Sequence, residues 1–136
     1  MESFAELVDL AREARDKAYA PYSGFAVGAA LLAKSGRIYS GCNVENASYG
    51  LSICAERVAI FKAVCAGEQQ FEALAVASET LATPCGACRQ VLAEFGLDIQ
   101  VIVAGLEEER EVYTVGDLLP VSFTPESLHS PSTKDL

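Results

Sequence analysis

Two short cysteine motifs constrain this 136-residue chain more than any other feature of its sequence. The first reads Cys54-Ala55-Glu56-Arg57, and the second reads Pro84-Cys85-Gly86-Ala87-Cys88-Arg89. Two cysteines spaced as in the second motif can bind one metal ion, and Cys54 can supply a third thiolate. Three protein thiolates leave one position of a tetrahedral zinc ion open, as in catalytic rather than structural sites. We therefore expect the fold to bring the two motifs together, each at the start of a helix.

Glu56 lies two residues after Cys54, so it must be close to such a metal ion. A hard carboxylate is a poor fourth ligand beside three soft thiolates, and we interpret Glu56 as a proton carrier instead. Zinc in a site of this kind makes hydroxide available near neutral pH. A lone CxxC is a weak signal, but Cys-x-Glu together with Pro-Cys-x-x-Cys matches the three-cysteine signature of zinc deaminases.

Four segments, in order along the chain, resemble the cytidine deaminase family and in particular its short, homotetrameric, three-cysteine branch. They are residues 20–25, 41–49, 54–57 and 84–90, within a similarity that runs from about residue 19 to about residue 119. The resemblance implies an α/β protein with a three-layer α/β/α cytidine-deaminase-like fold and a five-stranded mixed sheet. It also implies one Zn²⁺ per subunit and a homotetramer with shared active sites.

The function that the resemblance implies is hydrolytic deamination of cytidine and 2′-deoxycytidine to uridine and 2′-deoxyuridine, with release of ammonia, as in pyrimidine salvage. Glu56 would take a proton from the attacking water, deliver it to the pyrimidine N3, and then protonate the departing amino group. Arg57 would donate hydrogen bonds to cysteine sulfur, which offsets the net negative charge of Zn²⁺ with three thiolates. Arg89 is the alternative for that role.

The resemblance also assigns substrate contacts. Phe25 would pack on the pyrimidine, and Asn43 and Glu45 would bind the ribose 3′-hydroxyl. The remaining contacts are backbone groups that hold the base edge and aromatic side chains that reach a neighbouring subunit's pocket. These are the Ala55 N–H and Thr83 C=O for the base edge, and Tyr49 and Phe123 for the neighbouring pocket.

Plainer interpretations stay open at this point. The three cysteines could belong to a non-catalytic structural zinc module, and Phe25 could be a core residue of a strand. Asn43 and Glu45 could be turn residues that cap a strand end. Among enzymes, the alternative is a deaminase of another cytosine-bearing small molecule, such as a nucleoside antibiotic. A turnover assay separates an enzyme from a zinc module, and a substrate panel separates the two kinds of substrate.

Composition excludes several partners. The chain has 10 basic and 19 acidic residues, a formal charge of −9, and such a surface repels the phosphates of nucleic acids. Five cysteines, an odd number, favour metal ligands and inert thiols over a disulfide framework, and we expect Cys42 and Cys65 to be buried thiols rather than ligands. The N-terminus has no signal-peptide pattern, and no apolar run is long enough to span a membrane. We therefore expect a cytoplasmic protein.

The hydrophobic periodicity predicts one domain, residues 1–129, followed by a flexible tail, 130–136, with the lone His129 at the surface. A Ser3–Glu6 capping box would start the first helix. Val58, Phe61 and Cys65 are predicted to form the core face of the helix that begins at Cys54. The predicted helices are 4–19, 54–67, 84–95 and a turn at 124–128; the predicted strands are 25–33, 38–42, 73–78, 99–104 and 112–115. A polar binding loop at 43–53 and a charged turn at 107–111 complete the prediction.

Overall fold

The computed structural model describes residues 4–128, which form one five-stranded sheet with helices packed against it. Ser3 of the predicted capping box, His129 and the predicted tail 130–136 lie outside the described residues. The strand order is β2-β1-β3-β4-β5, and only β3 and β4 pair in parallel. The strands are β1 (Gly28–Ala33), β2 (Ile38–Cys42), β3 (Phe71–Ala77), β4 (Gln100–Ala104) and β5 (Arg110–Thr114). The predicted five-stranded mixed sheet is confirmed.

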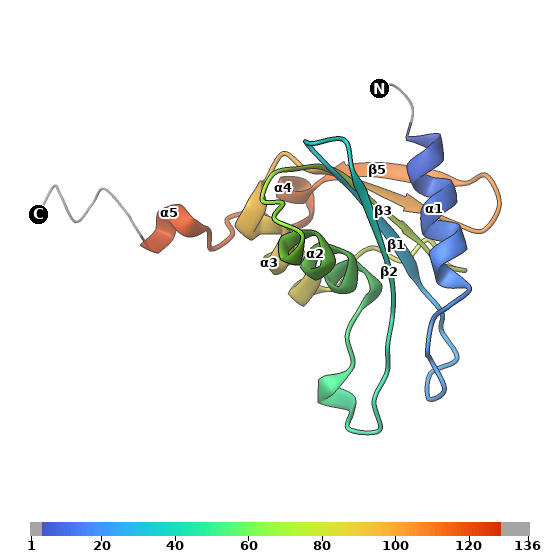
Figure 1. Cartoon of the computed structure of the whole chain (residues 1–136). Helices are drawn as coiled ribbons and strands as arrows, with labels where there is room; N and C mark the ends of the chain where they lie inside the picture. Colours follow the sequence, from blue (N-terminus) through green and yellow to red (C-terminus); the bar gives the residue numbers. More distant parts are fainter. Residues whose placement is uncertain (1–3, 129–136) are drawn as a thin grey trace, which may run out of the picture.

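Helices cover both faces of this sheet (Figure 1). Helix α1 (Ala5–Arg15) lies on one face, and α2 (Ala55–Cys65) and α3 (Gly86–Phe95) lie on the other. Successive residues of a strand point to opposite faces, so Ala30 packs with α1 whereas Leu31 packs with α2 and α3. The result is the predicted three-layer α/β/α arrangement, with one hydrophobic cluster on each side of the sheet.

Two glycines let the helices approach the sheet closely. A side chain at Gly28 would collide with the backbone of α1 at Ala11. A Cβ atom at Gly41 would lie 2.7 Å from the Ala59 nitrogen and 2.8 Å from the Ala55 oxygen, both in α2. Strand β2 therefore contacts the first turns of α2 directly, and this contact places the helix start that carries one cysteine motif.

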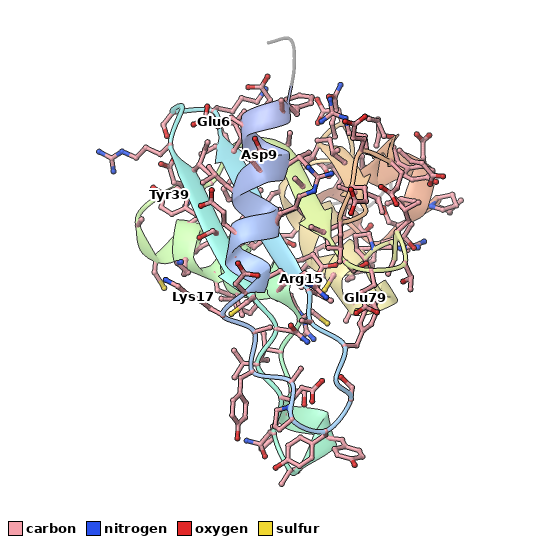
Figure 2. The ribbon with its side chains drawn as sticks, turned by 90° about the vertical axis from the view of Figure 1, so that its right-hand side faces the viewer. Glu6, Asp9, Arg15, Lys17, Tyr39 and Glu79 are labelled. Atoms are coloured by element: carbon pink, nitrogen blue, oxygen red, sulfur yellow. The ribbon has the colours of Figure 1, made fainter. Side chains whose placement is uncertain are left out.

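The Arg15 side chain, at the end of α1, contacts two loops. Its Nε donates to the Ala26 carbonyl at 3.0 Å, and its Nη2 lies 3.4 Å from Oε2 of Glu79. Figure 2 shows this pair beside the C-terminal end of α1, above the projecting loops. The segment that leads into β1 is thus tied to the helix that precedes it.

Two predicted boundaries near these loops are wrong for one reason. Helix α1 ends at Arg15 rather than at residue 19, because Tyr19 pairs with the loop that follows β2. Its N–H donates to the Asn43 carbonyl at 2.9 Å, and its carbonyl accepts from the Glu45 N–H at 2.8 Å. Strand β1 begins at Gly28 rather than at residue 25, because the Asn43 side chain takes the backbone groups of the preceding residues. Long-range pairing overrides the local pattern at both places.

The predicted core face of α2 is also wrong. Phe61 is 45% exposed and Cys65 is exposed, so neither belongs to the core of the single chain. Helix α2 instead buries three alanines, one isoleucine and the glutamate beside the cysteine site: Ala55, Ala59, Ala63, Ile60 and Glu56. Two of these alanines, Ala55 and Ala59, lie at the close contact between α2 and Gly41. The face that carries Val58, Phe61 and Cys65 lines an apolar surface groove instead.

The C-terminal part corrects the prediction in a smaller way. The predicted charged turn at 107–111 is shorter, because β5 already begins at Arg110. A short helix α4 (Val115–Leu118) starts where the last strand was expected to end, and Thr114 and Asp117 cap it reciprocally. The predicted helical turn at 124–128 is confirmed as α5 (Pro125–Leu128). Among residues 4–128, no helix is long and apolar enough to cross a bilayer.

Candidate active site

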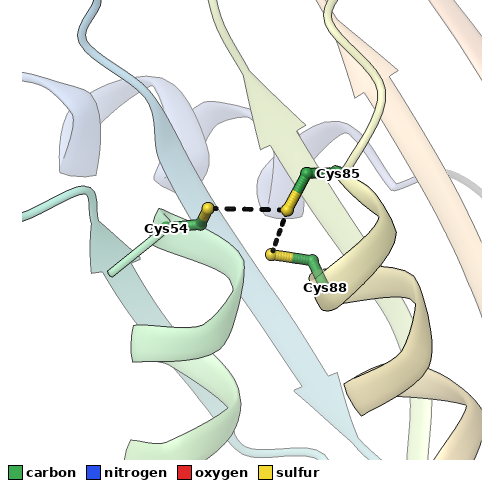
Figure 3. Close-up of side chains that lie close together, drawn as sticks. All are labelled: Cys54, Cys85 and Cys88. Atoms are coloured by element: carbon green, nitrogen blue, oxygen red, sulfur yellow. Dashed lines mark hydrogen bonds between the residues drawn. The ribbon is translucent and has the colours of Figure 1, made fainter. Parts of the chain in front are cut away.

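Three cysteine sulfurs meet where two helices begin (Figure 3). Cys54 and Cys85 are the residues that immediately precede α2 and α3, and Cys88 is in the first turn of α3. The Sγ atoms of Cys54 and Cys85 are 3.7 Å apart, and those of Cys85 and Cys88 are 3.6 Å apart. The structure thus brings all three predicted ligands together from segments about thirty residues apart.

The geometry fits a zinc ion. Zinc–thiolate bonds of about 2.3 Å in a tetrahedron place the sulfurs about 3.8 Å apart, close to the distances observed. The three ligand atoms all lie within 4.8 Å of one another, and this group, searched over the described residues, holds no fourth ligand. Both helices direct their N-termini at the cluster, and this favours thiolates over thiols. The site is therefore a zinc-binding region with three protein ligands.

Hydrogen bonds within the cluster shift the pKa values of two cysteines and of Arg57. The pKa of Cys54 is lowered to about 5, first by a hydrogen bond from Cys88 and then, against the effect of burial, by Arg57 and Cys85. The pKa of the buried Cys88 thiol is raised in turn, because it shares its proton with Cys54. Nη2 of Arg57 lies 3.6 Å from Sγ of Cys54, and this contact raises the pKa of the guanidinium. Arg57 therefore lies where the sequence predicts a counter-charge to sulfur.

Glu56 is the one carboxylate buried beside the cluster among the described residues. Its side chain is only 5% exposed, although it follows Cys54 by two positions at the start of a helix. Burial raises its pKa to about 7, and the negative charge of Cys54 adds to that shift. A carboxyl group with a pKa near neutrality can both accept and donate a proton at neutral pH.

Two projecting loops, residues 19–27 and 43–53, carry the predicted sugar contacts and Phe25, the residue predicted to pack on the base. The Asn43 amide donates to the Phe25 carbonyl at 2.8 Å and accepts from the Val27 N–H at 2.9 Å. The Glu45 carboxylate accepts from the N–H groups of Tyr22 and Ser23 at 3.0 and 3.1 Å and from the Ser23 hydroxyl. The Ser23 hydroxyl is the main cause of a lowered pKa at Glu45.

These contacts modify the interpretation of both residues. The Asn43 side chain has a structural role, because its two hydrogen bonds join the two loops. An amide side chain can make four hydrogen bonds, so two of its hydrogen-bonding positions remain for a substrate. Glu45 lines an open pocket of about 280 Å³ together with Tyr22, Ser23, Tyr49 and Ser52. Phe25 is partly buried and lies before β1, so it is not a core residue of a strand.

The Arg89 side chain binds loop and helix-end oxygen atoms rather than the sulfur cluster. Its guanidinium donates to the Pro84 carbonyl at 2.7 Å, the Leu118 carbonyl at 2.6 Å and the Thr83 hydroxyl at 2.9 Å. It thereby fixes the segment that leads into α3, including the backbone of Thr83. Ala55, the other predicted base-edge residue, is the buried first residue of α2.

Tyr49 and Phe123 are far out on the surface of the single chain. Tyr49 is 75% exposed in a short 3₁₀ turn (Tyr49–Leu51), and its ring packs 6.0 Å from that of Tyr22. Phe123 is 57% exposed, and its carbonyl accepts from Nε2 of Gln90. Figure 1 shows that the Tyr49 turn and the segment leading to α5 project from the body in different directions. One chain does not bring these two aromatic residues together.

The remaining cysteines stand apart from the cluster. Cys42 lies at the end of β2, as predicted, but it is half-buried rather than buried, and its thiol donates to the Lys17 carbonyl at 3.3 Å. Cys65 is exposed rather than buried, so its predicted place in the core is wrong. Sequence reasoning also missed Ser23, whose hydroxyl contacts Glu45, although a serine before glycine is a typical turn signal.

Comparison with known proteins places these features in one family. The sequence profile described as the cytidine and deoxycytidylate deaminase zinc-binding region matches residues 1–105. The chain is 50% identical over 126 residues to a cytidine deaminase of Sporosarcina psychrophila, covering 90% of this chain and 93% of that protein. It is 48% identical to one of Halalkalibacterium halodurans, covering 90% of this chain and 96% of that protein.

Solved structures agree with this result. A crystal structure of cytidine deaminase from Burkholderia pseudomallei superposes with a TM-score of 0.86 at 49% identity, covering 89% of this chain and 99% of that one. A cytidine deaminase structure from Mycobacterium tuberculosis superposes with a TM-score of 0.78 at 40% identity, covering 90% of this chain and 98% of that one. The relatives match the described fold over nearly its whole length.

Proposed function

Because the chain belongs to the cytidine and deoxycytidylate deaminase zinc-binding family, we propose that it hydrolyses cytidine and 2′-deoxycytidine to uridine and 2′-deoxyuridine, with release of ammonia. One observation carries the proposal: a buried carboxylate, Glu56, lies in the first turn of the helix that a ligand of the three-sulfur cluster precedes. Three protein ligands leave a tetrahedral zinc ion one open position. A purely structural zinc site needs neither that carboxylate nor that open position.

Each residue around the cluster has a task in this reaction. Zinc held by the three sulfurs supplies Lewis acidity, which makes hydroxide available at neutral pH. Glu56 takes one proton of the attacking water and passes it to N3 of the pyrimidine as the hydroxide adds to C4. It then moves the remaining proton of the new hydroxyl group to the amino group, so that the C4–N bond breaks, ammonia leaves and the C4 carbonyl forms. Arg57 donates to Cys54 and reduces the excess negative charge that three thiolates bring to the metal.

Backbone groups and the two loops hold the substrate. The Ala55 N–H is free of intrahelical bonds because it is in the first turn of α2, and it can donate to the base edge. The Thr83 carbonyl, in the segment that Arg89 fixes, can accept from the base. Phe25 packs on the pyrimidine, and Asn43 and Glu45 bind the 3′-hydroxyl.

The direct test incubates the zinc-loaded protein with cytidine and follows ammonia. Cytosine and cytidine 5′-monophosphate are measured alongside, together with 2′-deoxycytidine. We expect turnover of both nucleosides, very slow turnover of the free base, and rejection of the phosphate, because the chain carries a formal charge of −9 and its sugar pocket contains Glu45. Absence of ammonia from cytidine would contradict the proposal.

Recognition of the sugar gives a specific prediction. Glu45→Ala should lower kcat/KM for cytidine by about tenfold to a hundredfold, because a charged hydrogen-bond partner of the hydroxyl is lost. With 3′-deoxycytidine, which lacks that hydroxyl, the same variant should show a much smaller decrease in kcat/KM. Kinetics with both substrates, for wild type and variant, provide the measurement. If the ratio of the two substrates is unchanged by Glu45→Ala, the sugar contact lies elsewhere.

We also propose a homotetramer whose subunits complete each other's sites, in the cytoplasm, where the five free thiols remain reduced. The exposed positions of Tyr49 and Phe123 support this, since both aromatic side chains lie mostly uncovered on the single chain. So does the exposed apolar face of α2 around Phe61, because large apolar patches often mark interfaces.

Light scattering should therefore give a mass near that of four chains for the active protein. The measurement is best paired with an activity assay on the same chromatographic fraction. An active species with the mass of one chain would rule out shared sites.

A further inference from the structure

Ser23 occupies a junction between the two loops of the substrate site. Its hydroxyl donates to the Glu45 carboxylate and accepts from the Phe25 N–H at 2.9 Å. Gly24 lies between Ser23 and Phe25 with φ +70°, a conformation that favours glycine and closes this turn. One hydroxyl group thus contacts the sugar-binding carboxylate and the backbone of the base-packing aromatic residue at the same time.

The Phe25 backbone is held on both sides as a result. Ser23 accepts from its N–H, and the Asn43 amide donates to its carbonyl. Glu45 is held just as firmly, because its Oε1 accepts from two backbone N–H groups and its Oε2 accepts from Ser23. A carboxylate has about four lone-pair positions, so one position on Oε2 stays available toward the pocket that Glu45 lines.

We propose that Ser23 is a positioning residue that sets the specificity of the site for nucleosides over free bases. This inference rests on the proposed function and concerns the same site. By joining Glu45 to the Phe25 backbone, the Ser23 hydroxyl fixes the spacing between the sugar contact and the base contact. A nucleoside needs both contacts at a defined spacing, whereas free cytosine needs only one.

The chain contains a matched control for this arrangement. Ser35, Gly36 and Arg37 form the turn between β1 and β2, at the other end of β1 from the substrate loops. The Ser35 hydroxyl accepts from the Arg37 N–H at 3.3 Å and donates to Oε2 of Glu68 at 2.7 Å, and Gly36 has φ +95°. Both serines are exposed, and the hydroxyl of each lowers the pKa of its glutamate. The two arrangements differ in location and in the second donor to the glutamate, which is backbone N–H at Glu45 and the Tyr39 hydroxyl at Glu68.

The experiment compares Ser23→Ala, Ser23→Thr and Ser35→Ala as zinc-loaded proteins. Ser23→Ala should raise KM for cytidine about tenfold, the size expected for one hydrogen bond to a charged group, while kcat stays within about threefold. The ratio of kcat/KM for cytidine to that for cytosine should fall by about the same factor. Ser23→Thr keeps the hydroxyl and should restore most of the loss. Ser35→Ala should leave all these values unchanged.

A double substitution tests the route of the effect. If Ser23 acts through Glu45, then Ser23→Ala should lower kcat/KM for cytidine much less in the Glu45→Ala background than in wild type. The effects of substitutions at two coupled residues are not additive. The proposal is overturned if Ser23→Ala behaves like Ser35→Ala, or if it lowers kcat equally for cytidine and cytosine. It is also overturned if threonine at position 23 is no better than alanine.

Uridine binding separates this proposal from the proposed function. Calorimetric titration of the same variants with uridine needs no turnover, and Ser23→Ala should weaken binding about tenfold relative to Ser35→Ala. Wild-type protein that binds uridine but releases no ammonia from cytidine would contradict the proposed function alone. Equal uridine affinity in Ser23→Ala and wild type would contradict the role of Ser23 alone.

Discussion

Replacing Glu56 by glutamine should lower turnover of cytidine by about four orders of magnitude or more, while one zinc ion per chain is retained. General acid–base catalysis by one group contributes about 10²–10⁴-fold, and Glu56 is assigned more than one proton transfer. Glutamine keeps the shape of the side chain but cannot carry the proton. Stopped-time ammonia assays and zinc analysis on the same sample give the two numbers that are needed.

The stability of this variant supplies an internal check. Burial raises the pKa of Glu56, so the ionised carboxylate is disfavoured by folding, and neutral glutamine should unfold at an equal or higher temperature. Glu94→Gln, an exposed change on α3, is the matched control and should leave both turnover and stability unchanged. Near-normal turnover of zinc-loaded Glu56→Gln would remove Glu56 from the mechanism.

The parts of the fold that sequence predicts well are those that local chemistry decides. Strand β2 has the predicted bounds, and α3 begins directly after Cys85, where a proline and a CxxC pattern indicate a helix start. Cys54, Cys85 and Cys88 could be predicted as ligands because zinc imposes residue types and spacing that are visible along the chain. The five-stranded mixed character of the sheet follows from the resemblance rather than from any local signal.

The parts that sequence misses depend on partners remote along the chain. The end of α1 is decided by Tyr19 pairing with the loop after β2, and the buried face of α2 by contact with Gly41. Ser23 was missed because a short hydroxyl side chain reveals its acceptor only when Glu45, over twenty residues away, is placed beside it. The sequence leaves Arg89 as an alternative hydrogen-bond donor to cysteine sulfur, but its guanidinium binds the carbonyl groups of Pro84 and Leu118 instead.

Replacing Cys88 by serine should weaken zinc binding by more than about a hundredfold and reduce turnover to background. Loss of an outer hydrogen-bond partner of a metal ligand alone costs about 10–100-fold in affinity, and loss of a ligand must cost more. Serine is chosen because Cys88 is fully buried, and a nearly isosteric side chain leaves no cavity in the first turn of α3. Metal analysis after dialysis against a weak chelator measures the effect without any need for activity.

Cys65→Ser is the control that makes the result specific. Cys65 ends the helix that Cys54 precedes, but it is exposed and lies outside the sulfur cluster, so this variant should retain one zinc ion per chain. Cys85→Ser should lose zinc as Cys88→Ser does, although Cys85 is exposed and Cys88 is buried. Equal loss at an exposed and a buried position would identify ligation, rather than packing, as the cause. If Cys88→Ser keeps its zinc, or if Cys65→Ser loses it, the three-cysteine site is wrong.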